Sequence, residues 1–350
     1  VNQIGGQDEL AFDGGSFVVN PDYTMAVRAP FWTEALMMTE WNRSVDGWVC
    51  APGHVQPSLS REENVYSAMM LGLRDYVTKN GFPGIVIGLS GGIDSALSAA
   101  VAVDALGADS VLAVMMPSPY TSADSLEDAA AGAKMLGIRL EQVNIGPAMD
   151  AFNTMLAPLF KGREPDITEE NIQARARGLT LMALSNKLGH MLLTTGNKSE
   201  MSVGYATLYG DMCGGFSVLK DVYKTTVFAL SRWRNTHLPL SALGPDGMAM
   251  PERVIIKPPS AELRPDQKDE DSLPAYEDLD TMLQAMIEGE RSVDDIVKLG
   301  YDVDTVKRIW RLLDRAEYKR RQAPPGVKIT GRAFGKDRRY PITNGFTKQI

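Results

Sequence analysis

Cysteine is nearly absent from this chain of 350 residues, which carries only Cys50 and Cys213. Two cysteines cannot build a disulfide framework or a cysteine-rich zinc site, and their scarcity suits a reducing compartment. The three histidines, His54, His190 and His237, are scattered without the short spacing of paired metal ligands. The sequence therefore predicts no zinc site.

Long apolar runs and an excess of positive charge are also missing. The best apolar stretch, residues 96–103, is much shorter than the roughly 18 residues that suggest a membrane span. The first residues show neither a basic region nor an apolar one, so no signal peptide is predicted. The formal net charge of −8 argues against a general nucleic-acid binder. We therefore expect a cytoplasmic protein without membrane or nucleic-acid partners.

The first 58 residues differ in pattern from the rest. Two short β-type runs, residues 9–12 and 16–19, flank a turn at 13–15, which is typical of a hairpin. Asn20-Pro21-Asp22 predicts a second turn. Because so few short strands cannot enclose a core, we interpret 1–58 as a β-rich remnant of a larger unit with a linker. Residues 59–330 then form the main domain, and residues 331–350 form a tail.

From about residue 60, short apolar runs alternate with segments of helical spacing. This order predicts an α/β fold, a doubly wound parallel sheet with helices on both faces, in which ligands bind outside the carboxyl ends of the strands. The predicted strands are 85–87, 110–116, 138–145 and 191–194; the predicted helices are 61–79, about 95–106, 121–136, about 169–188, 276–288, 292–299 and 304–320.

The strongest motif is Gly88-Leu89-Ser90-Gly91-Gly92-Ile93-Asp94-Ser95, between a buried strand and an alanine-rich helix. Its glycines allow a tight turn against a ligand, and the helix that follows presents positive dipole to an anion. A carboxylate beside a phosphate is useful when it holds Mg²⁺. The motif lacks both the Gly-Lys-Ser/Thr of a Walker loop and the G-x-G-x-x-G of a dinucleotide fold. We therefore expect a phosphate or pyrophosphate site of another kind.

The Ser-Gly-Gly-Ile-Asp-Ser turn resembles the pyrophosphate-binding loop of ATP-pyrophosphatases that adenylate their substrate. Three further motifs narrow the resemblance to the NAD synthetase family: residues 194–200 (Thr-Thr-Gly-Asn-Lys-Ser-Glu), 220–225 (Lys-Asp-Val-Tyr-Lys-Thr) and 258–265 (Pro-Pro-Ser-Ala-Glu-Leu-Arg-Pro). The matches run in family order from about residue 61 to 330. The resemblance implies a ligase that adenylates the carboxylate of deamido-NAD with ATP and Mg²⁺, and then replaces AMP by ammonia to give NAD.

The resemblance also implies roles for individual residues. Asp94 and Glu200 would hold Mg²⁺. The residues implied to bind ATP are Gly88, Leu89, Ser90, Gly91, Gly92, Ile93, Asp94, Ser95, Thr195, Lys224 and Ser260. Those implied to bind deamido-NAD are Asn171, Arg175, Glu200, Asp211 and Lys319; the first two lie one helical turn apart and so share a face. Arg177, Lys198, Lys220 and Cys213 are left without a role.

Residues 2–14 resemble the end of a nitrilase-like glutaminase domain, as in the glutamine-dependent form of the family. The glutaminase triad of that form lies upstream of these strands, so we expect ammonia, and not glutamine, to serve this chain. Homodimers or larger homo-oligomers are implied as well. Two alternatives stay open: another adenylating enzyme, such as a GMP synthetase or a tRNA sulfur transferase, and a nucleotide-binding module without turnover.

Overall fold

A parallel β-sheet forms the centre of the molecule. The computed structural model describes residues 1–45, 47–264 and 267–345. In the central sheet, β7 (Ile85–Gly88), β8 (Val111–Met115), β9 (Arg139–Gln142), β10 (Met191–Thr194) and β11 (Phe216–Ser217) lie in the order β11-β10-β7-β8-β9. All neighbouring pairs are parallel. The chain adds β8 and β9 on one side of β7, and then β10 and β11 on the other.

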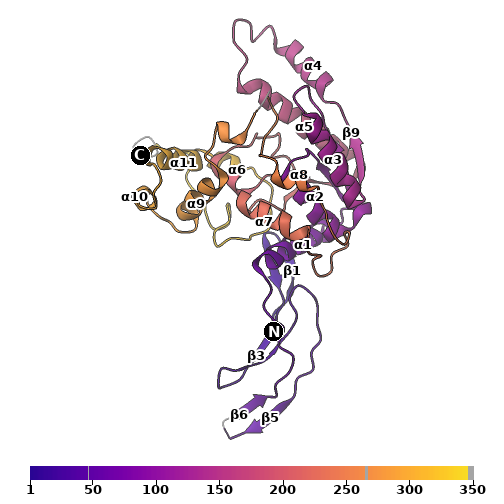
Figure 1. The fold of residues 1–350 in the computed structure, drawn as a ribbon, viewed down its shortest axis with the longest axis vertical. Helices are drawn as coiled ribbons and strands as arrows, with labels where there is room; N and C mark the ends of the chain where they lie inside the picture. The colour runs from indigo at the N-terminus through magenta and orange to yellow at the C-terminus, as the bar shows by residue number, and fades with distance from the viewer. Residues whose placement is uncertain (46, 265–266, 346–350) are drawn as a thin grey trace.

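Helices cover both faces of this sheet (Figure 1). Ile85 and Ile87 share one core with helices α1 (Arg61–Lys79), α2 (Ile93–Leu106), α3 (Ala123–Leu136) and α7 (Lys224–Arg234). Val86, between them in sequence, belongs to the core beneath α5 (Ile167–Leu188). Successive residues of a strand point to opposite faces, so both faces of β7 are apolar because both are covered. The predicted doubly wound α/β fold is confirmed.

The remaining helices extend the body. These are α4 (Gly146–Leu156), α6 (Lys198–Val203), α8 (Glu252–Ile256), α9 (Tyr276–Ile287), α10 (Val293–Val297), α11 (Val303–Arg315) and α12 (Glu317–Arg320), with short 3₁₀ turns at Ala108–Ser110 and Asp269–Asp271. Helices α9 and α11 pack around Leu279, Leu283, Ile309 and Leu313 in a second core. The predicted helix 304–320 is two helices, because Ala316 ends α11 and precedes α12.

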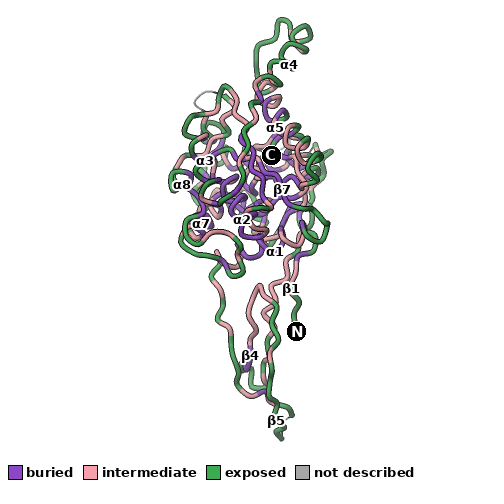
Figure 2. Tube along the Cα trace, turned by 90° about the vertical axis from the view of Figure 1, so that its right-hand side faces the viewer, coloured by how far each residue is buried: buried purple, intermediate pink, exposed green. Residues whose placement is uncertain are grey.

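The N-terminal segment forms an arm that extends away from the body (Figures 1 and 2). It contains three antiparallel pairs of strands: β1 (Ile4–Gln7) with β2 (Leu10–Asp13), β3 (Phe17–Val19) with β4 (Met25–Arg28), and β5 (Trp41–Ser44) with β6 (Gly47–Cys50). The predicted hairpin across residues 13–15 is wrong, because β2 and β3 each pair with another strand. The turn at 20–22 does join β3 to β4.

The first of these pairs is attached to the body. The Gly6 N–H donates to Asp75 Oδ2 at 2.7 Å, and Lys79 Nζ of the same helix α1 donates to the Gly6 carbonyl at 2.9 Å. The Lys328 N–H donates to the Glu9 carbonyl at 2.7 Å. The boundaries at 58 and 330 stay predictions, and residues 346–350 of the predicted tail lie outside the described residues. Among the described helices, none is long and apolar enough to cross a membrane.

Candidate active site

The candidate site lies where the strand order reverses. The turn after β7 and the turn after β10 leave adjacent strands at their carboxyl ends, which is where doubly wound sheets bind ligands. A cavity of about 300 Å³ opens between these turns and is lined by residues 88–95, 194–196, 257–263 and others. The position expected from the order of strands and helices is thus the position of a real cavity.

The glycine-rich turn is shaped by close approach to a second helix. Gly91 has φ +80°, and a Cβ at this position would lie 2.2 Å from the Ser125 carbonyl oxygen of α3. The residue before α2 is Gly92, so this helix begins without a side-chain cap. Ser90 Oγ and Ser95 Oγ lie 3.0 Å apart across the turn. An uncapped helix N-terminus with hydroxyls beside it suits a phosphate group.

A buried lysine lies between the two predicted metal carboxylates. Lys224 Nζ pairs with Asp94 Oδ2 and lies 3.5 Å from Glu200 Oε1. Burial raises the pKa of Glu200 to about 8, and the neighbouring Asp94 adds to the rise, while Lys224 opposes it. Burial alone would lower the pKa of Lys224, but the two carboxylates outweigh it and raise that pKa. The three groups therefore form one interdependent charge cluster at the edge of the cavity.

The carboxylate pair fits Mg²⁺. Both side chains are 18% exposed and line the cavity. Within the described residues, no group of three or more histidine, cysteine or acidic side chains is placed to hold a metal ion. Mg²⁺ in phosphate-transfer sites commonly takes only one or two protein carboxylates, and completes its shell with phosphate oxygens and water. Two carboxylates beside the predicted phosphate-binding turn match that pattern.

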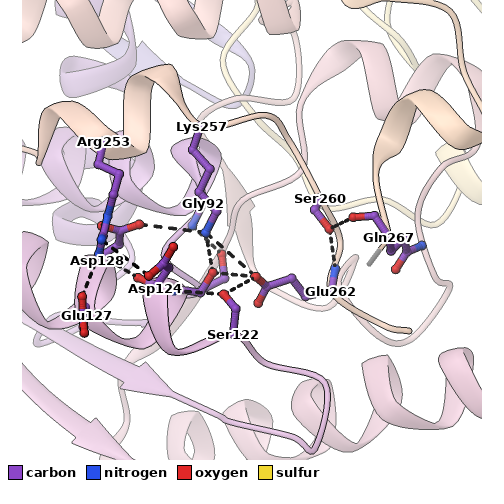
Figure 3. A network of polar contacts seen from close by, with 12 residues as sticks. Gly92, Ser122, Asp124, Glu127, Asp128, Arg253, Lys257, Ser260, Glu262 and Gln267 are labelled. Carbon is purple, nitrogen blue, oxygen red and sulfur yellow. Dashed lines mark hydrogen bonds and ion pairs between the residues drawn. The ribbon is translucent and has the colours of Figure 1, made fainter. Parts of the chain in front are cut away.

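The N-terminus of α3 is the second helix end at the cavity (Figure 3). Glu262 Oε1 accepts hydrogen bonds from Ser122 Oγ at 2.8 Å and from Ser125 Oγ at 2.7 Å. Lys257 Nζ donates to the same Ser125 hydroxyl at 2.6 Å. Ser260 Oγ donates to the Gln267 carbonyl, so this predicted ATP-binding hydroxyl also shapes its own loop. The 257–263 loop thus places the Glu262 carboxylate at the N-terminus of α3.

Three of the residues predicted to bind deamido-NAD contact residues 204–211, and a fourth, Asp211, lies within this segment. Asn171 Oδ1 accepts from Thr207 Oγ1 at 3.0 Å, and Arg175 Nε donates to the Leu208 carbonyl at 3.2 Å. Lys319 Nζ donates to the carbonyls of Gly204 and Ala206. Asp211 Oδ1 accepts from the Thr207 N–H at 2.7 Å. The predicted substrate residues therefore converge on one segment beside the cavity.

The structure brings most predicted residues to one cavity. Those that line it are Gly88, Leu89, Ser90, Gly91, Gly92, Ile93, Asp94, Ser95, Thr195, Glu200, Asp211, Lys224 and Ser260. Three predicted residues do not line the cavity but contact the 204–211 segment, part of which lines it: Asn171, Arg175 and Lys319. Pro265, part of one family motif, lies outside the described residues. The individual roles of all these residues stay predictions.

Several residues without a predicted role also lie here. Arg177 lines the cavity, and burial lowers its pKa to about 10 against the opposing effect of Glu262 and Asp211. Lys220 and Cys213 line the cavity as well. Sequence reasoning missed Asn197, whose side chain is fully buried behind the carboxylate pair. A signal was available, because Asn197 and Glu200 have the spacing of a capping box.

Comparison with known proteins agrees with this geometry. The family model described as NAD synthase matches residues 65–323. The glutamine-dependent NAD(+) synthetase of Rhodobacter capsulatus is 53% identical over all of this chain. This chain spans 63% of the length of that relative. The sequence similarity thus covers the arm as well as the body.

Solved structures give the same result. The glutamine-dependent NAD+ synthetase of Acinetobacter baumannii, in complex with ADP, is 48% identical with a TM-score of 0.69, and the match covers 99% of this chain and 61% of that one. The NH3-dependent NAD synthetase of Campylobacter jejuni is 25% identical with a TM-score of 0.59, over 75% of this chain and 96% of that one. The family model, the relatives and these structures agree: the chain belongs to the NAD synthase family.

Proposed function

We propose that this chain is the synthetase part of an ATP-dependent ligase that converts deamido-NAD to NAD. The observation that carries the proposal is the joint placement of the Ser90–Ser95 turn, the Asp94 and Glu200 carboxylates, and Lys224 around one cavity. Such a set suits a triphosphate and its metal ion. Family membership supports NAD synthesis as the reaction in which that triphosphate is used.

The chemistry explains why a nucleotide is needed. A nicotinate carboxylate does not react with ammonia at neutral pH, because oxide is too poor a leaving group. When the carboxylate oxygen bonds to the α-phosphorus of ATP, the bond to pyrophosphate breaks and an acyl adenylate forms. Ammonia then forms the C–N bond while the bond to AMP breaks and one proton is released. The protein mainly has to align two polyanions and neutralise their charge.

The residues of the chain divide this work. The Ser90–Ser95 turn would hold the phosphates by backbone N–H groups and hydroxyls, with Thr195 and Ser260 beside the nucleotide. Lys224 would donate to phosphate oxygens. Asp94 and Glu200 would hold Mg²⁺, which when bound neutralises phosphate charge. Asn171, Arg175, Asp211 and Lys319 would position deamido-NAD through the 204–211 segment, where their contacts already converge.

Ammonia as the nitrogen source has separate support. An NH3-dependent synthetase matches this chain over 96% of its own length, so the matched region is nearly all of that protein. We propose that this chain uses ammonia directly, and that glutamine serves only when an upstream glutaminase supplies ammonia from it. The homo-oligomer implied by the resemblance is a further proposal, which light scattering would measure.

The test is to measure products and requirements together. We expect AMP and pyrophosphate to appear only when ATP, Mg²⁺, deamido-NAD and ammonia are all present, and glutamine not to replace ammonia. Formation of ADP would contradict adenylation. Robust use of glutamine would contradict our interpretation of residues 1–58.

Substrate and variant controls sharpen this test. Nicotinate mononucleotide and xanthylate in place of deamido-NAD separate the related amidations, because an NMN synthetase from Francisella tularensis is 27% identical with a TM-score of 0.62. Asp94→Asn should remove turnover. Asp109→Asn, which changes an exposed carboxylate at the far end of α2, should leave turnover unchanged. Nucleotide binding without product at high ammonia would favour a module without turnover.

A further inference from the structure

One buried residue, Asn197, contacts both predicted metal carboxylates, one through its side chain and the other through its backbone. Asn197 is fully buried and immediately precedes α6. Its Nδ2 donates to Asp94 Oδ1 at 2.9 Å, and its Oδ1 accepts from the Glu200 N–H at 3.0 Å. Its own N–H donates to Glu200 Oε2 at 3.4 Å. A single residue thus connects the turn after β7 to the turn after β10.

Asn197 holds the two carboxylates with different groups, Asp94 with its side-chain amide and Glu200 with its backbone N–H. Asp94 directs Oδ1 to Asn197 and Oδ2 to Lys224. Glu200 directs Oε2 to the Asn197 N–H and Oε1 to Lys224. In each carboxylate, one oxygen is therefore fixed by Asn197 from the protein side, and the other faces the cation. We infer that Asn197 is a positioning residue for the metal site, which orients Asp94 and Glu200 so that their second oxygens are available to Mg²⁺; this rests on the proposed function.

The chemistry of asparagine explains why an amide stands at this position. Ser, Thr and Asp also cap helices, because each offers an oxygen to the backbone N–H groups of the first turn. Only the amide offers that oxygen together with an N–H donor at the same end of the side chain. It is also neutral, so it orients Asp94 without competing for the charge of Lys224 or of a metal ion. The capping role and the link to Asp94 are therefore separable by substitution.

The backbone around Asn197 is fixed from outside the site. The Lys198 N–H donates to the Val222 carbonyl at 2.9 Å, and Ser217 Oγ donates to the Gly196 carbonyl at 3.2 Å. The Lys198 ammonium is buried and pairs with Asp221 at 2.8 Å. Because both neighbours are held, the amide has a defined position from which to orient the carboxylates. Partners of metal ligands typically change metal affinity or activity roughly 10–100-fold when removed.

The deciding variant is Asn197→Ser. A serine hydroxyl can still cap α6 at Glu200 but is too short to reach Asp94. We expect near-normal thermal stability, with a roughly 10–100-fold weaker Kd for Mn²⁺ measured by electron paramagnetic resonance in the presence of a non-hydrolysable ATP analogue. The Mg²⁺ concentration for half-maximal turnover should rise in parallel. Asp302→Ser is the matched control, since Asp302 caps the remote helix α11, and it should leave the Mn²⁺ Kd unchanged.

A second variant covers failure of the first to fold. Asn197→Thr keeps a neutral capping oxygen, but it is also too short to donate to Asp94, and we expect the same loss of Mn²⁺ affinity. A folded variant of either kind with the wild-type Mn²⁺ Kd overturns the inference. So does an equal loss in Asp302→Ser, because the effect would then come from capping alone. If product formation requires no metal in the wild-type chain, the proposed function fails instead.

Discussion

Two buried lysines of this protein have similar surroundings but differ in their access to the cavity, which Lys224 lines and Lys198 does not. Lys198 lies between Asp221 and Glu288, with its ammonium 4.9 Å from the centre of the Tyr223 ring. Lys224 lies between Asp94 and Glu200, 5.2 Å from the centre of the Tyr276 ring. Each is at most 2% exposed, pairs with two carboxylates and lies against an aromatic ring. Lys198 Nζ also lies 5.6 Å from the centre of the Phe334 ring.

The difference is in what else surrounds each ammonium. Lys198 Nζ also donates to Thr330 Oγ1 at 2.6 Å and to the Arg332 carbonyl at 2.9 Å, so protein groups satisfy it on several sides. Asp221 in turn accepts from the backbone N–H groups of Ile329 and Thr330. The carboxylates of Lys224 line the cavity instead. We call Lys198 with Asp221 and Glu288 the closed cluster, because it joins distant segments of the chain. We call Lys224 with Asp94 and Glu200 the open cluster, because its partners could be exchanged for a ligand in the cavity.

The largest expected effect is that of Lys224→Met on turnover. Loss of the Lys224 ammonium removes a hydrogen-bond donor to the phosphate oxygens and leaves Asp94 and Glu200 to repel the incoming nucleotide. We therefore expect AMP formation to fall by roughly 10³-fold or more. The fold should persist, since the cavity gives the carboxylates access to water and Mg²⁺. Product formation and thermal unfolding measure the two quantities. Turnover within tenfold of wild type would contradict the distinction between the clusters.

The reverse pattern is expected for Lys198→Met. Removal of one partner from a buried ion pair leaves the other charge uncompensated, which costs about 3–5 kcal/mol in the free energy of unfolding. Denaturant unfolding measures this loss. Turnover per folded molecule should change far less than in Lys224→Met, because Lys198 lies outside the cavity lining. A stable but inactive Lys198→Met protein would place this lysine in the reaction.

Tyr276→Phe should have a smaller effect. Its hydroxyl donates to Asp269 Oδ2 at 2.8 Å, and Asp269 Oδ1 is buried without a hydrogen-bond partner among the described residues. Removal of a hydrogen bond to a buried charged group costs about 2 kcal/mol. Because Asp269 lines the cavity, we also expect a weaker apparent affinity for ATP. Equal ATP affinity in the variant and the wild type would show that Tyr276 does not act with Lys224, Asp94 and Glu200 in nucleotide binding.

Tyr223→Phe completes the comparison with the smallest effect. The Tyr223 hydroxyl donates to Glu288 Oε2 at 2.8 Å, but Glu288 keeps its pairing with Lys198. We expect a loss of about 1 kcal/mol in the free energy of unfolding, and unchanged ATP affinity. Calorimetric titration with ATP on both phenylalanine variants checks the contrast directly.

The body of the fold could be predicted because its signals are local. The bare apolar run at 85–87 predicts a buried strand, and the glycine-rich motif after it predicts a tight turn, which the structure places at the cavity. The arm could not be predicted in the same way. Gly15 has φ +57°, and a Cβ there would lie 2.4 Å from the Phe31 ring, so this glycine leaves room for the Phe31 side chain. It does not close a hairpin, because β2 and β3 pair with other strands. Turn residues show where the chain bends, and not which strands then pair.

The candidate site likewise has features that the sequence could predict and features that it could not. Asp94 and Glu200 follow strand ends, and the topology brings strand ends together, so their meeting could be predicted. The burial of Lys198 could not, because a lysine in a polar loop is ordinarily solvated. Its partners, among them Asp221, Glu288 and Thr330, come from separate parts of the sequence. The family resemblance already separates Lys224 from Lys198 as an ATP-binding residue, but only the folded chain shows that both lysines are buried.

The attachment of the first strand pair has a practical consequence for dissecting this protein. The Glu9 carbonyl accepts from the Lys328 N–H, and Gly6 bonds to the Asp75 and Lys79 side chains of α1. The opening residues thus bond to α1 and to the chain two residues before Thr330. Thr330 in turn bonds to Lys198. A shortened version beginning near Pro57 would lose those backbone partners, and a minimal catalytic fragment should therefore retain residues 1–15.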